Sequence, residues 1–273
     1  MNNSTISAAV SMSSLQKRLD VIADNVANVD TIGYKGRQGS FEDVLTRVQQ
    51  QSPDYNQPGR NTPLGFNIGF GVRMSQVANN WEEGPLKETG NPTDLALQGN
   101  GVFGIQVNGN TVYTRQGDFH FTPDINNAAN MLLVDNQGHS VLDAQGNPLT
   151  VPAGVIAAID ETGQVLTKQR EDGPVTKGPR IMIAEPRSKD ALQAIDGSYY
   201  KLADGIAATD AFLPRAANEA SAVGVRSGWL EQSNVDLTKE MTELMQIQRT
   251  YQLASRALSS SDQMLGLANN MRG

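Results

Sequence analysis

The sequence lacks cysteine, has few aromatic residues and contains no long hydrophobic run. The absence of cysteine from the 273 residues excludes disulfides, zinc thiolates and cysteine nucleophiles. Aromatic residues make up only 5% of the chain, which argues against the stacking platforms of a sugar-binding protein. Because no apolar run approaches the roughly 18–20 residues that cross a bilayer, we expect no direct membrane insertion. The start of the chain lacks the charge and apolar core of a secretory signal, so we expect any export to proceed without a cleaved signal peptide.

Positive charge is scarce as well. The formal net charge is −7 and no cluster of lysine or arginine is present, so we expect no nucleic-acid partner. Residues 1–38 carry four basic and three acidic groups, and residues 228–273 carry four basic and five acidic groups. The two ends together are therefore neutral, and the whole excess of negative charge lies between them. Neutral ends can pack against copies of themselves without strong repulsion.

The two ends of the chain show the spacing of amphipathic helices. Residues 1 to about 35 contain no proline, and their apolar residues recur at intervals of three and four, as on the contact face of a paired helix. The segment from about 234 to 270 repeats this pattern, and Ser233, Asn234 and Asp236 stand where a helix cap is expected. We predict that the two helices pair, antiparallel or nearly so. Their predicted assembly interface consists of Met12, Leu15, Leu19, Ile22, Asn25, Val26, Asn28, Val29, Leu237, Met241, Leu244, Ile247, Tyr251, Leu258 and Leu265.

The middle of the chain has a different pattern. From about residue 75 to 225, Asn-Pro, Asn-Gly and Asp-Gly pairs separate short apolar runs, which predicts many short strands and tight turns. The predicted fold class is α+β, mainly β: long N- and C-terminal helices pair as a coiled-coil-like stalk, and a β-rich module is inserted between them. The predicted domains are a terminal helical polymerisation domain of residues 1–38 and 228–273, an extended arm or linker of residues 39–75, and a β-rich outer module of residues 76–227.

Polar and sulfur-containing residues on the helical stripes leave alternatives open. Asn25 and Asn28 either face solvent or are buried on a helix seam, where a neighbouring helix in a repeated assembly would supply hydrogen-bond partners. Methionines at helical spacing either pack in the core of one molecule or form adaptable contacts between subunits. These methionines are Met12, Met241, Met245, Met264 and Met271.

No segment has the pattern of a convincing active site. Residues 99–104, GNGVFG, match the GxGxxG pattern of dinucleotide-binding loops, but a hairpin-like run follows them in place of the required helix. His120 and His139 are the only histidines, and no acidic residues repeat at ligand spacing beside them. Ser233 and the serines at 259–261 lack a paired base. We therefore predict no catalytic residue, no cofactor, no metal site and no enzymatic activity.

Four motifs, in order along the chain, carry a family resemblance. They are LDVIADNVANVDTIGYK at residues 19–35, TGNPTDLAL with GNGVF at residues 89–103, YTRQGDF at residues 113–119, and GWLEQSNVDL at residues 228–237. This set resembles the bacterial flagellar basal-body rod and hook proteins, and most closely the distal rod protein and its paralogues. Departures from the family pattern leave the particular paralogue open: Asp24 and Asp30 in place of asparagine, and an extra segment from Pro123 to Asn130.

The resemblance implies a structural subunit of the flagellar rod, an axial drive shaft for motility. It implies export through the flagellar type III apparatus, assembly in the basal body outside the inner membrane (in the periplasm or cell wall), and polymerisation through the terminal helices. The implied partners are copies of the chain in a helical tube, other rod and hook proteins, and the export apparatus. Two other hypotheses stay open: a cell-surface scaffold or adhesin paralogue with the same helix-pair assembly, and a secreted β-rich carbohydrate-active protein.

Overall fold

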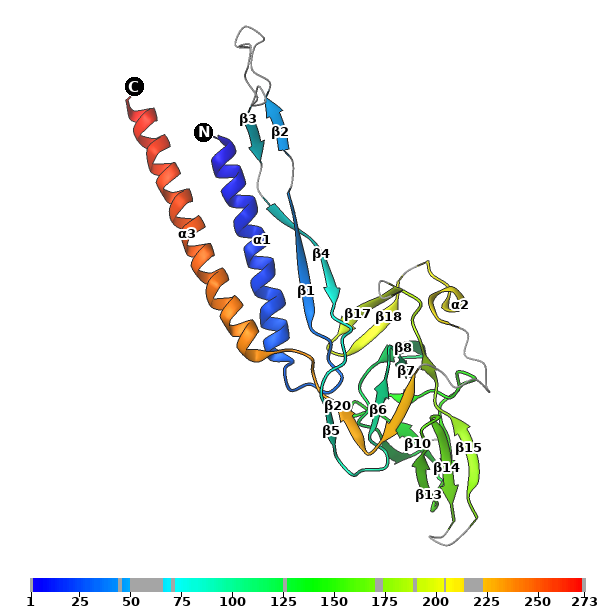
Figure 1. Cartoon of the computed structure of the whole chain (residues 1–273). Helices are drawn as coiled ribbons and strands as arrows, with labels where there is room; N and C mark the ends of the chain where they lie inside the picture. The colour runs from blue at the N-terminus through cyan, green and yellow to red at the C-terminus, as the bar shows by residue number, and fades with distance from the viewer. Residues whose placement is uncertain are drawn as a thin grey trace, which may run out of the picture. The chain divides into compact units, whose positions relative to one another are not determined.

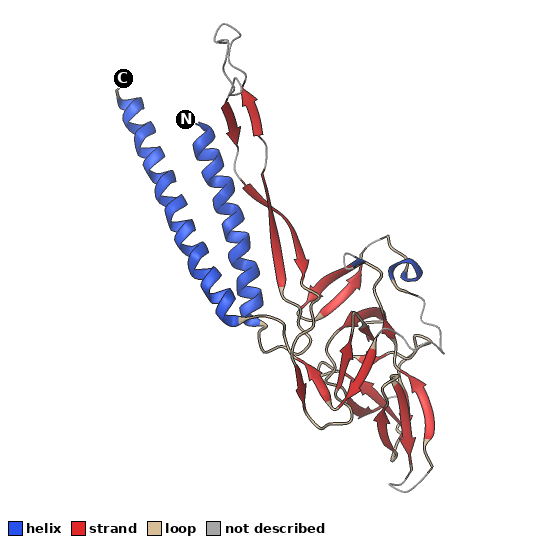
Figure 2. Ribbon diagram, viewed as in Figure 1, coloured by secondary structure: helices blue, strands red, loops and turns tan. Residues whose placement is uncertain are grey.

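The chain divides into two units in its computed structural model. The model describes residues 2–43, 46–49, 66–69, 72–124, 127–169, 174–188, 191–203, 205–213 and 223–271. By internal contacts, the helical unit comprises residues 1–26, 37–78 and 236–273, and the β-rich unit comprises residues 27–36 and 79–235. The molecule is therefore mainly β, with a long helix near each end of the chain (Figures 1 and 2).

The helical unit contains two long helices, α1 (Asn2–Ala27) and α3 (Leu237–Asn270). They lie side by side and run antiparallel (Figure 1), since Arg18 contacts Glu243 while the later Asn25 contacts the earlier Glu240. The antiparallel direction agrees with the prediction from the two apolar stripes. Within the described segments, neither helix is apolar enough to cross a membrane.

Helix α1 ends earlier than the sequence pattern predicts. The expected helix extends to about residue 35, but α1 stops at Ala27 and a turn follows, in which the Asn28 carbonyl accepts the Thr31 N–H at 3.2 Å. Gly33 has φ +66°, a left-handed conformation that favours glycine. A Cβ at this position would lie 2.5 Å from the backbone carbon of Arg115, so this close approach of two chain segments also requires glycine.

Helix α3 begins at the predicted cap. The Asp236 carboxylate accepts the N–H groups of Thr238 at 2.9 Å and Lys239 at 3.2 Å, which satisfies two donors that the first turn of a helix leaves unpaired. Glu240 places a further negative charge in the first turn, where the helix dipole favours it. Of the three predicted capping residues, Asp236 therefore serves as the N-cap.

Described residues of the predicted arm form strands within the helical unit. Strands β1 (Arg37–Asp43) and β4 (Val72–Asn79) form one two-stranded sheet. Strands β2 (Thr46–Gln49) and β3 (Phe66–Gly69) form another antiparallel pair. Residues 50–65, where the linker composition is strongest, lie outside the described residues.

A nine-stranded sheet forms the centre of the described β-rich unit. Its middle is the hairpin of β7 (Val102–Val107) and β8 (Asn110–Thr114), closed by Asn108 at φ 51° and Gly109 at φ 82°. This Asn-Gly turn confirms the hairpin predicted after the glycine-rich run. The other strands of this sheet are β9 (His120–Pro123), β10 (Asn130–Val134), β11 (Ser140–Val141), β12 (Thr150–Pro152), β16 (Ile183–Ala184), β17 (Leu192–Asp196) and β18 (Tyr199–Leu202).

Smaller sheets and a short helix complete the β-rich unit. Strands β13 (Ile156–Ile159), β14 (Gln164–Lys168) and β15 (Thr176–Arg180) form a three-stranded sheet. Two antiparallel strand pairs join distant parts of the sequence: β5 (Leu86–Glu88) with β20 (Trp229–Glu231), and β6 (Leu95–Gln98) with β19 (Gly224–Ser227). The short helix α2 (Ala208–Ala211) also belongs to this unit.

Two hydrophobic clusters fill the β-rich unit. One is built around Phe103 and Phe119, whose rings meet edge to face with centroids 5.2 Å apart. The other contains Trp81 and Tyr200, with ring centroids 5.0 Å apart. Burial of this apolar surface is the main stabilising contribution to the unit.

Candidate assembly surface and buried ion cluster

The predicted interface residues of the helical unit differ widely in burial. Ile22 and Ile247 are buried, whereas Leu237 and Met241 are exposed. The side chain of Leu265 lies outside those that the structure describes. The remaining apolar members of this unit are half-buried: Met12, Leu15, Leu19, Val26, Leu244, Tyr251 and Leu258.

Two of the predicted interface residues do not lie on a helix. Asn28 and Val29 follow the end of α1 and belong to the β-rich unit. The Asn28 side chain accepts a hydrogen bond from the Thr31 hydroxyl at 3.2 Å. Their prediction as part of a helical stripe is therefore wrong, because the helical spacing continues in the sequence past the turn at which the helix stops.

Asn25 is buried, and its hydrogen-bond partners belong to the same chain. Its Oδ1 accepts the Arg37 N–H at 2.8 Å, and its Nδ2 donates to the Arg37 carbonyl at 2.9 Å and to Glu240 Oε1 at 3.2 Å. One amide thus joins α1, the start of β1 and the first turn of α3. These contacts provide intramolecular partners of the kind that the sequence-based interpretation assigned to a neighbouring subunit.

A second polar contact joins the two helices. Arg18 Nε donates to Glu243 Oε1 at 2.8 Å, and both side chains are partly shielded from solvent. Charge-assisted hydrogen bonds of this kind fix the register of two helices more than they stabilise them.

A row of large apolar side chains on α3 is exposed. Its members are 41% to 64% exposed, and the row extends over most of the helix. Single exposed apolar residues are ordinary, but a succession of them along one helix is typical of an interaction surface. These positions extend around about half of the helix circumference. We call this set the open face of α3: Leu237, Met241, Met245, Leu253, Met264 and Leu267.

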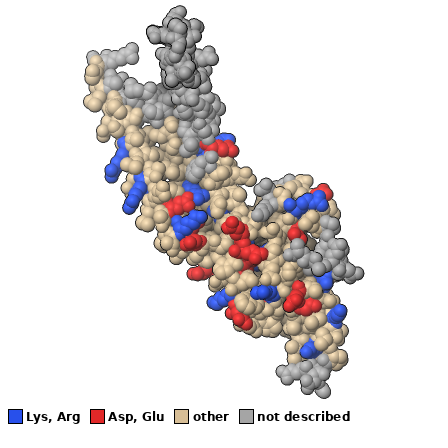
Figure 3. Space-filling model, viewed as in Figure 1, with Lys and Arg blue, Asp and Glu red and all other residues tan. Residues whose placement is uncertain are grey.

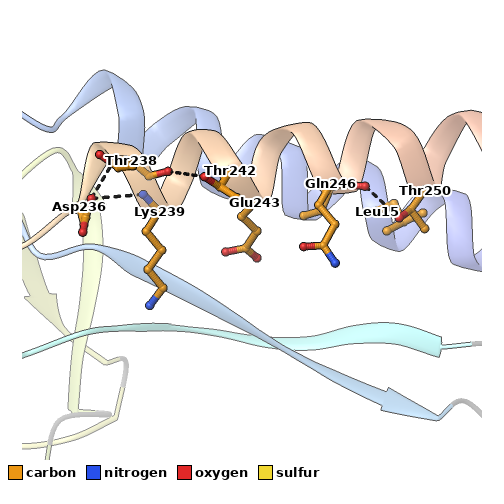
Figure 4. A pocket seen from close by; sticks show the side chains of 9 residues that line it. Leu15, Asp236, Thr238, Lys239, Thr242, Glu243, Gln246 and Thr250 are labelled. Carbon is orange, nitrogen blue, oxygen red and sulfur yellow. Dashed lines mark hydrogen bonds between the residues drawn. The ribbon is translucent and has the colours of Figure 1, made fainter.

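An open groove also follows the first four turns of α3 (Figure 4). Thr242 and Thr250 donate their hydroxyls to the carbonyls of Thr238 and Gln246, at 2.8 and 2.9 Å. Because the helix itself satisfies these hydroxyls, the threonines need no outside hydrogen-bond partner. Leu15 of α1 and Ile247 also line the groove, so its surface can accept apolar side chains.

The β-rich unit contains a buried ion cluster. The Glu231 carboxylate accepts Lys35 Nζ at 2.6 Å through Oε1 and Arg115 Nε at 2.6 Å through Oε2. All three side chains are only 1% exposed. On the surface seen in Figure 3, by contrast, charged side chains of both signs are interspersed.

Backbone groups complete the hydrogen bonding of the ion cluster. Lys35 Nζ also donates to the Glu82 carbonyl at 2.6 Å, and the Arg115 guanidinium donates to the carbonyls of Gly101 at 2.5 Å and Leu97 at 3.1 Å. The Gly84 N–H donates to Glu231 Oε1 at 2.9 Å. Buried charges are tolerated only when they are paired and hydrogen-bonded in this way.

Burial and charge shift the pKa values in this cluster. Burial lowers the pKa of Lys35, and the attraction of Glu231 offsets this only in part. Burial by itself would raise the pKa of Glu231, but the charges of Arg115 and Lys35 outweigh it and hold the pKa below its ordinary value. Glu231 therefore remains a carboxylate at neutral pH and serves two cations at once.

The other candidate sites have structural roles in the described residues. The glycine-rich run at 99–104 leads into strand β7, so its glycines lie in a loop and a sheet. His139 Nδ1 lies 3.1 Å from Asp135 Oδ2, which also accepts the Tyr199 hydroxyl at 2.8 Å. Among the residues that the structure describes, no group of three histidine or acidic side chains is arranged to hold a metal.

Comparisons with known proteins decide the family. Three family models match: "Flagella basal body rod protein" at residues 7–35, "Flagellar hook protein FlgE/F/G D1 domain" at residues 96–167, and "Flagellar basal body rod FlgEFG protein C-terminal" at residues 226–271. The chain is 31% identical to the flagellar hook-basal body complex protein FlhP of Bacillus subtilis, with 100% of both chains covered. It is 32% identical to the flagellar basal-body rod protein FlgG of Caulobacter vibrioides, with 97% of both chains covered.

The chain belongs to the flagellar basal-body rod protein family. It is thus a structural subunit of the flagellar rod, located in the basal body, and is not an enzyme. The flagellar rod and hook resemblance deduced from four motifs is confirmed.

The ion cluster brings together one residue from each of three family motifs. TIGYK supplies Lys35, YTRQGDF supplies Arg115, and GWLEQSNVDL supplies Glu231. Each motif contains a residue of the cluster beside other charged residues, so the sequence alone does not show which charges pair.

Proposed function

We propose that this rod subunit, in the manner of the distal rod protein, polymerises with copies of itself through α1 and α3. The open face of α3 carries this proposal, because its apolar side chains find no cover within the described chain. Covering each such side chain contributes about 1.5–3 kcal/mol in favour of association. Methionines at three of its six positions would let the same helix fit slightly different neighbours.

The two helices then form a coiled-coil-like stalk only in the assembled rod. Within one chain, the Arg18 and Asn25 contacts set an antiparallel register, but few of the apolar residues on α3 are buried. Isolated helices gain most of their stability from packing, so neighbouring subunits would complete the fold. The interface predicted from sequence remains part of this proposal, extended by Met245, Leu253, Met264 and Leu267 and without Asn28 and Val29.

Export and location follow from the same hypothesis. A chain whose terminal helices are completed only on assembly can pass unfolded through the flagellar type III apparatus, without a cleaved signal peptide. It would assemble outside the inner membrane, with the β-rich unit as a module inserted between the helices and facing outward. Its partners would be copies of itself, other rod and hook proteins, and the export apparatus.

The test compares two substitutions at one position of the open face. Met245→Asp places a charge where a neighbour would bury the side chain, whereas Met245→Leu preserves an apolar side chain of similar size. In cells that express only the variant, Met245→Asp should abolish swimming, and no hook–basal body with a complete rod should be recovered. Met245→Leu should preserve swimming and the complete rod. Normal rods and swimming with Met245→Asp would refute polymerisation through this face.

A further inference from the structure

The chain passes between its two units at the bonds that join residues 26 and 27, 36 and 37, 78 and 79, and 235 and 236. At the bonds 36/37, 78/79 and 235/236, the adjoining segments of the β-rich unit hydrogen-bond to one another. The Asn80 N–H donates to the Gly36 carbonyl at 2.7 Å, and the Gln232 N–H donates to the Pro85 carbonyl at 2.9 Å. The polypeptide therefore leaves and re-enters the β-rich unit through neighbouring segments.

Asn234 lies on one of these segments, and its side-chain amide binds the other two. Its Oδ1 accepts the Gly36 N–H at 2.8 Å, and its Nδ2 donates to the carbonyls of Asn80 and Glu82, each at 2.9 Å. A single side chain thus pairs with backbone groups beside the 36/37 and 78/79 crossings, while its own backbone leads into the crossing at 235/236. Two residues later the chain enters the helical unit at Asp236.

Glu231 binds the same segments from the buried side. Its carboxylate holds Lys35 and the Gly84 N–H, and its backbone carbonyl accepts the Gly33 N–H at 2.8 Å. Arg115 attaches this group to the main sheet through the end of β8 and the carbonyls of Leu97 and Gly101. Without Glu231, two buried cations would lie close together without the carboxylate that hydrogen-bonds to both of them.

We propose that Lys35, Arg115, Glu231 and Asn234 hold together the segments of the β-rich unit from which the chain passes into the helical unit. We call these four residues the clasp. This inference deepens the proposed function, because a subunit of a rotating shaft passes load along its covalent connections. Loose loops at the crossings would flex under that load. The clasp instead makes the connecting segments part of the rigid β-rich unit, and Glu231 is its central positioning residue.

Hydrogen exchange on the full-length chain tests the clasp without requiring polymerisation. Glu231→Gln keeps the shape of the side chain and removes its charge. Exchange of the Gly33, Gly36 and Gly84 amides should accelerate by about 100-fold or more, while the β7–β8 amides keep their protection. Unchanged exchange at the three glycines, or an equal rise throughout β7 and β8, would overturn the proposal.

Two further variants separate the charge from local packing. Glu88→Gln is the matched control, because Glu88 is an exposed carboxylate on β5, directly opposite Trp229 of β20, and its exchange pattern should equal that of the parent chain. Adding Lys35→Met to Glu231→Gln removes one of the two uncompensated cations and should restore part of the lost protection. No recovery in the double variant would show that charge pairing is not what closes the clasp.

Separate experiments test the clasp and the proposed polymerisation, so one can be wrong while the other stands. If Met245→Asp cells swim but Glu231→Gln opens the glycine amides, polymerisation through α3 is wrong and the clasp stands. If the clasp serves the shaft, cells with Glu231→Gln that still build rods should lose speed in viscous medium more steeply than Glu88→Gln cells. Equal speeds at every viscosity would overturn the mechanical role.

Discussion

The two units of this chain differ in how far they bury their apolar and charged side chains. The β-rich unit buries its aromatic residues in two clusters and even buries an ion cluster. The helical unit leaves a row of large apolar side chains exposed along α3. The β-rich unit thus has the buried core of a folded domain, whereas α3 of the helical unit keeps much of its apolar surface exposed. Under the proposed function, the β-rich unit folds by itself and partner subunits complete the helical unit.

The two tryptophans allow the units to be followed separately. Trp81 and Trp229 both belong to the β-rich unit, so tryptophan fluorescence reports on that unit alone. The long helices dominate the circular dichroism signal at the helical wavelengths. Urea unfolding of the full-length chain with both signals therefore compares the two units in one experiment.

The largest expected difference comes from truncating one apolar side chain in each unit. Phe103 is fully buried against Phe119, so Phe103→Ala should destabilise the β-rich unit by about 3–5 kcal/mol and lower the urea midpoint of the fluorescence transition. Met245→Ala should change the unpolymerised chain by no more than about 0.5 kcal/mol. A large loss of stability with Met245→Ala in the monomer would show that the open face is already covered within one chain.

A smaller effect is expected from Asn25. Asn25→Ala leaves the N–H and the carbonyl of Arg37 without their buried partner, which should cost about 1–3 kcal/mol in the helical unit. The circular dichroism transition should shift to lower urea while the fluorescence transition stays in place. Gln16→Ala, at an exposed position of the same helix, is the control and should shift neither. Equal stability of Asn25→Ala and Gln16→Ala would contradict the role of the amide.

The smallest effect concerns Glu240. Its Oε2 is buried and finds no hydrogen-bond partner among the described residues, and burial raises the pKa of this carboxyl. A raised pKa in the folded state means that Glu240 favours folding most below its ordinary pKa of 4.5, and that this contribution is lost as the pH rises through the folded value. Glu240→Gln should therefore stabilise the helical unit at pH 7 by less than about 1 kcal/mol, and should have no advantage below pH 4.5.

Acid should act on the two units in opposite directions. The pKa of Glu231 is lowered, so its contribution to folding is present above its ordinary pKa of 4.5 and is lost as the pH falls through the folded value. Below pH 4.5 the fluorescence transition should shift to lower urea, while protonation removes the penalty of burying the charged Glu240 in the helical unit. A parallel response of both transitions would show that these two carboxylates do not control the acid sensitivity of their units.

The sequence by itself determined the family, the two long helices and the strand-rich middle. Apolar spacing of three and four identifies a helix whether or not its partner is known, and the Asn-Gly turn at 108–109 specifies its hairpin locally. The Asp236 cap was also predictable, because a capping carboxylate acts on its own neighbours in the chain.

Only the tertiary structure decided where α1 stops, which apolar residues stay exposed, and which charges meet. The helical pattern runs past Ala27, but the chain turns there and Gly33 packs against the backbone of Arg115. Lys35, Arg115 and Glu231 are separated by 80 and 116 residues in sequence, so no local pattern links them. The physical reason is that a charge pair depends on distance in space, whereas helix and turn signals depend on neighbours in the chain.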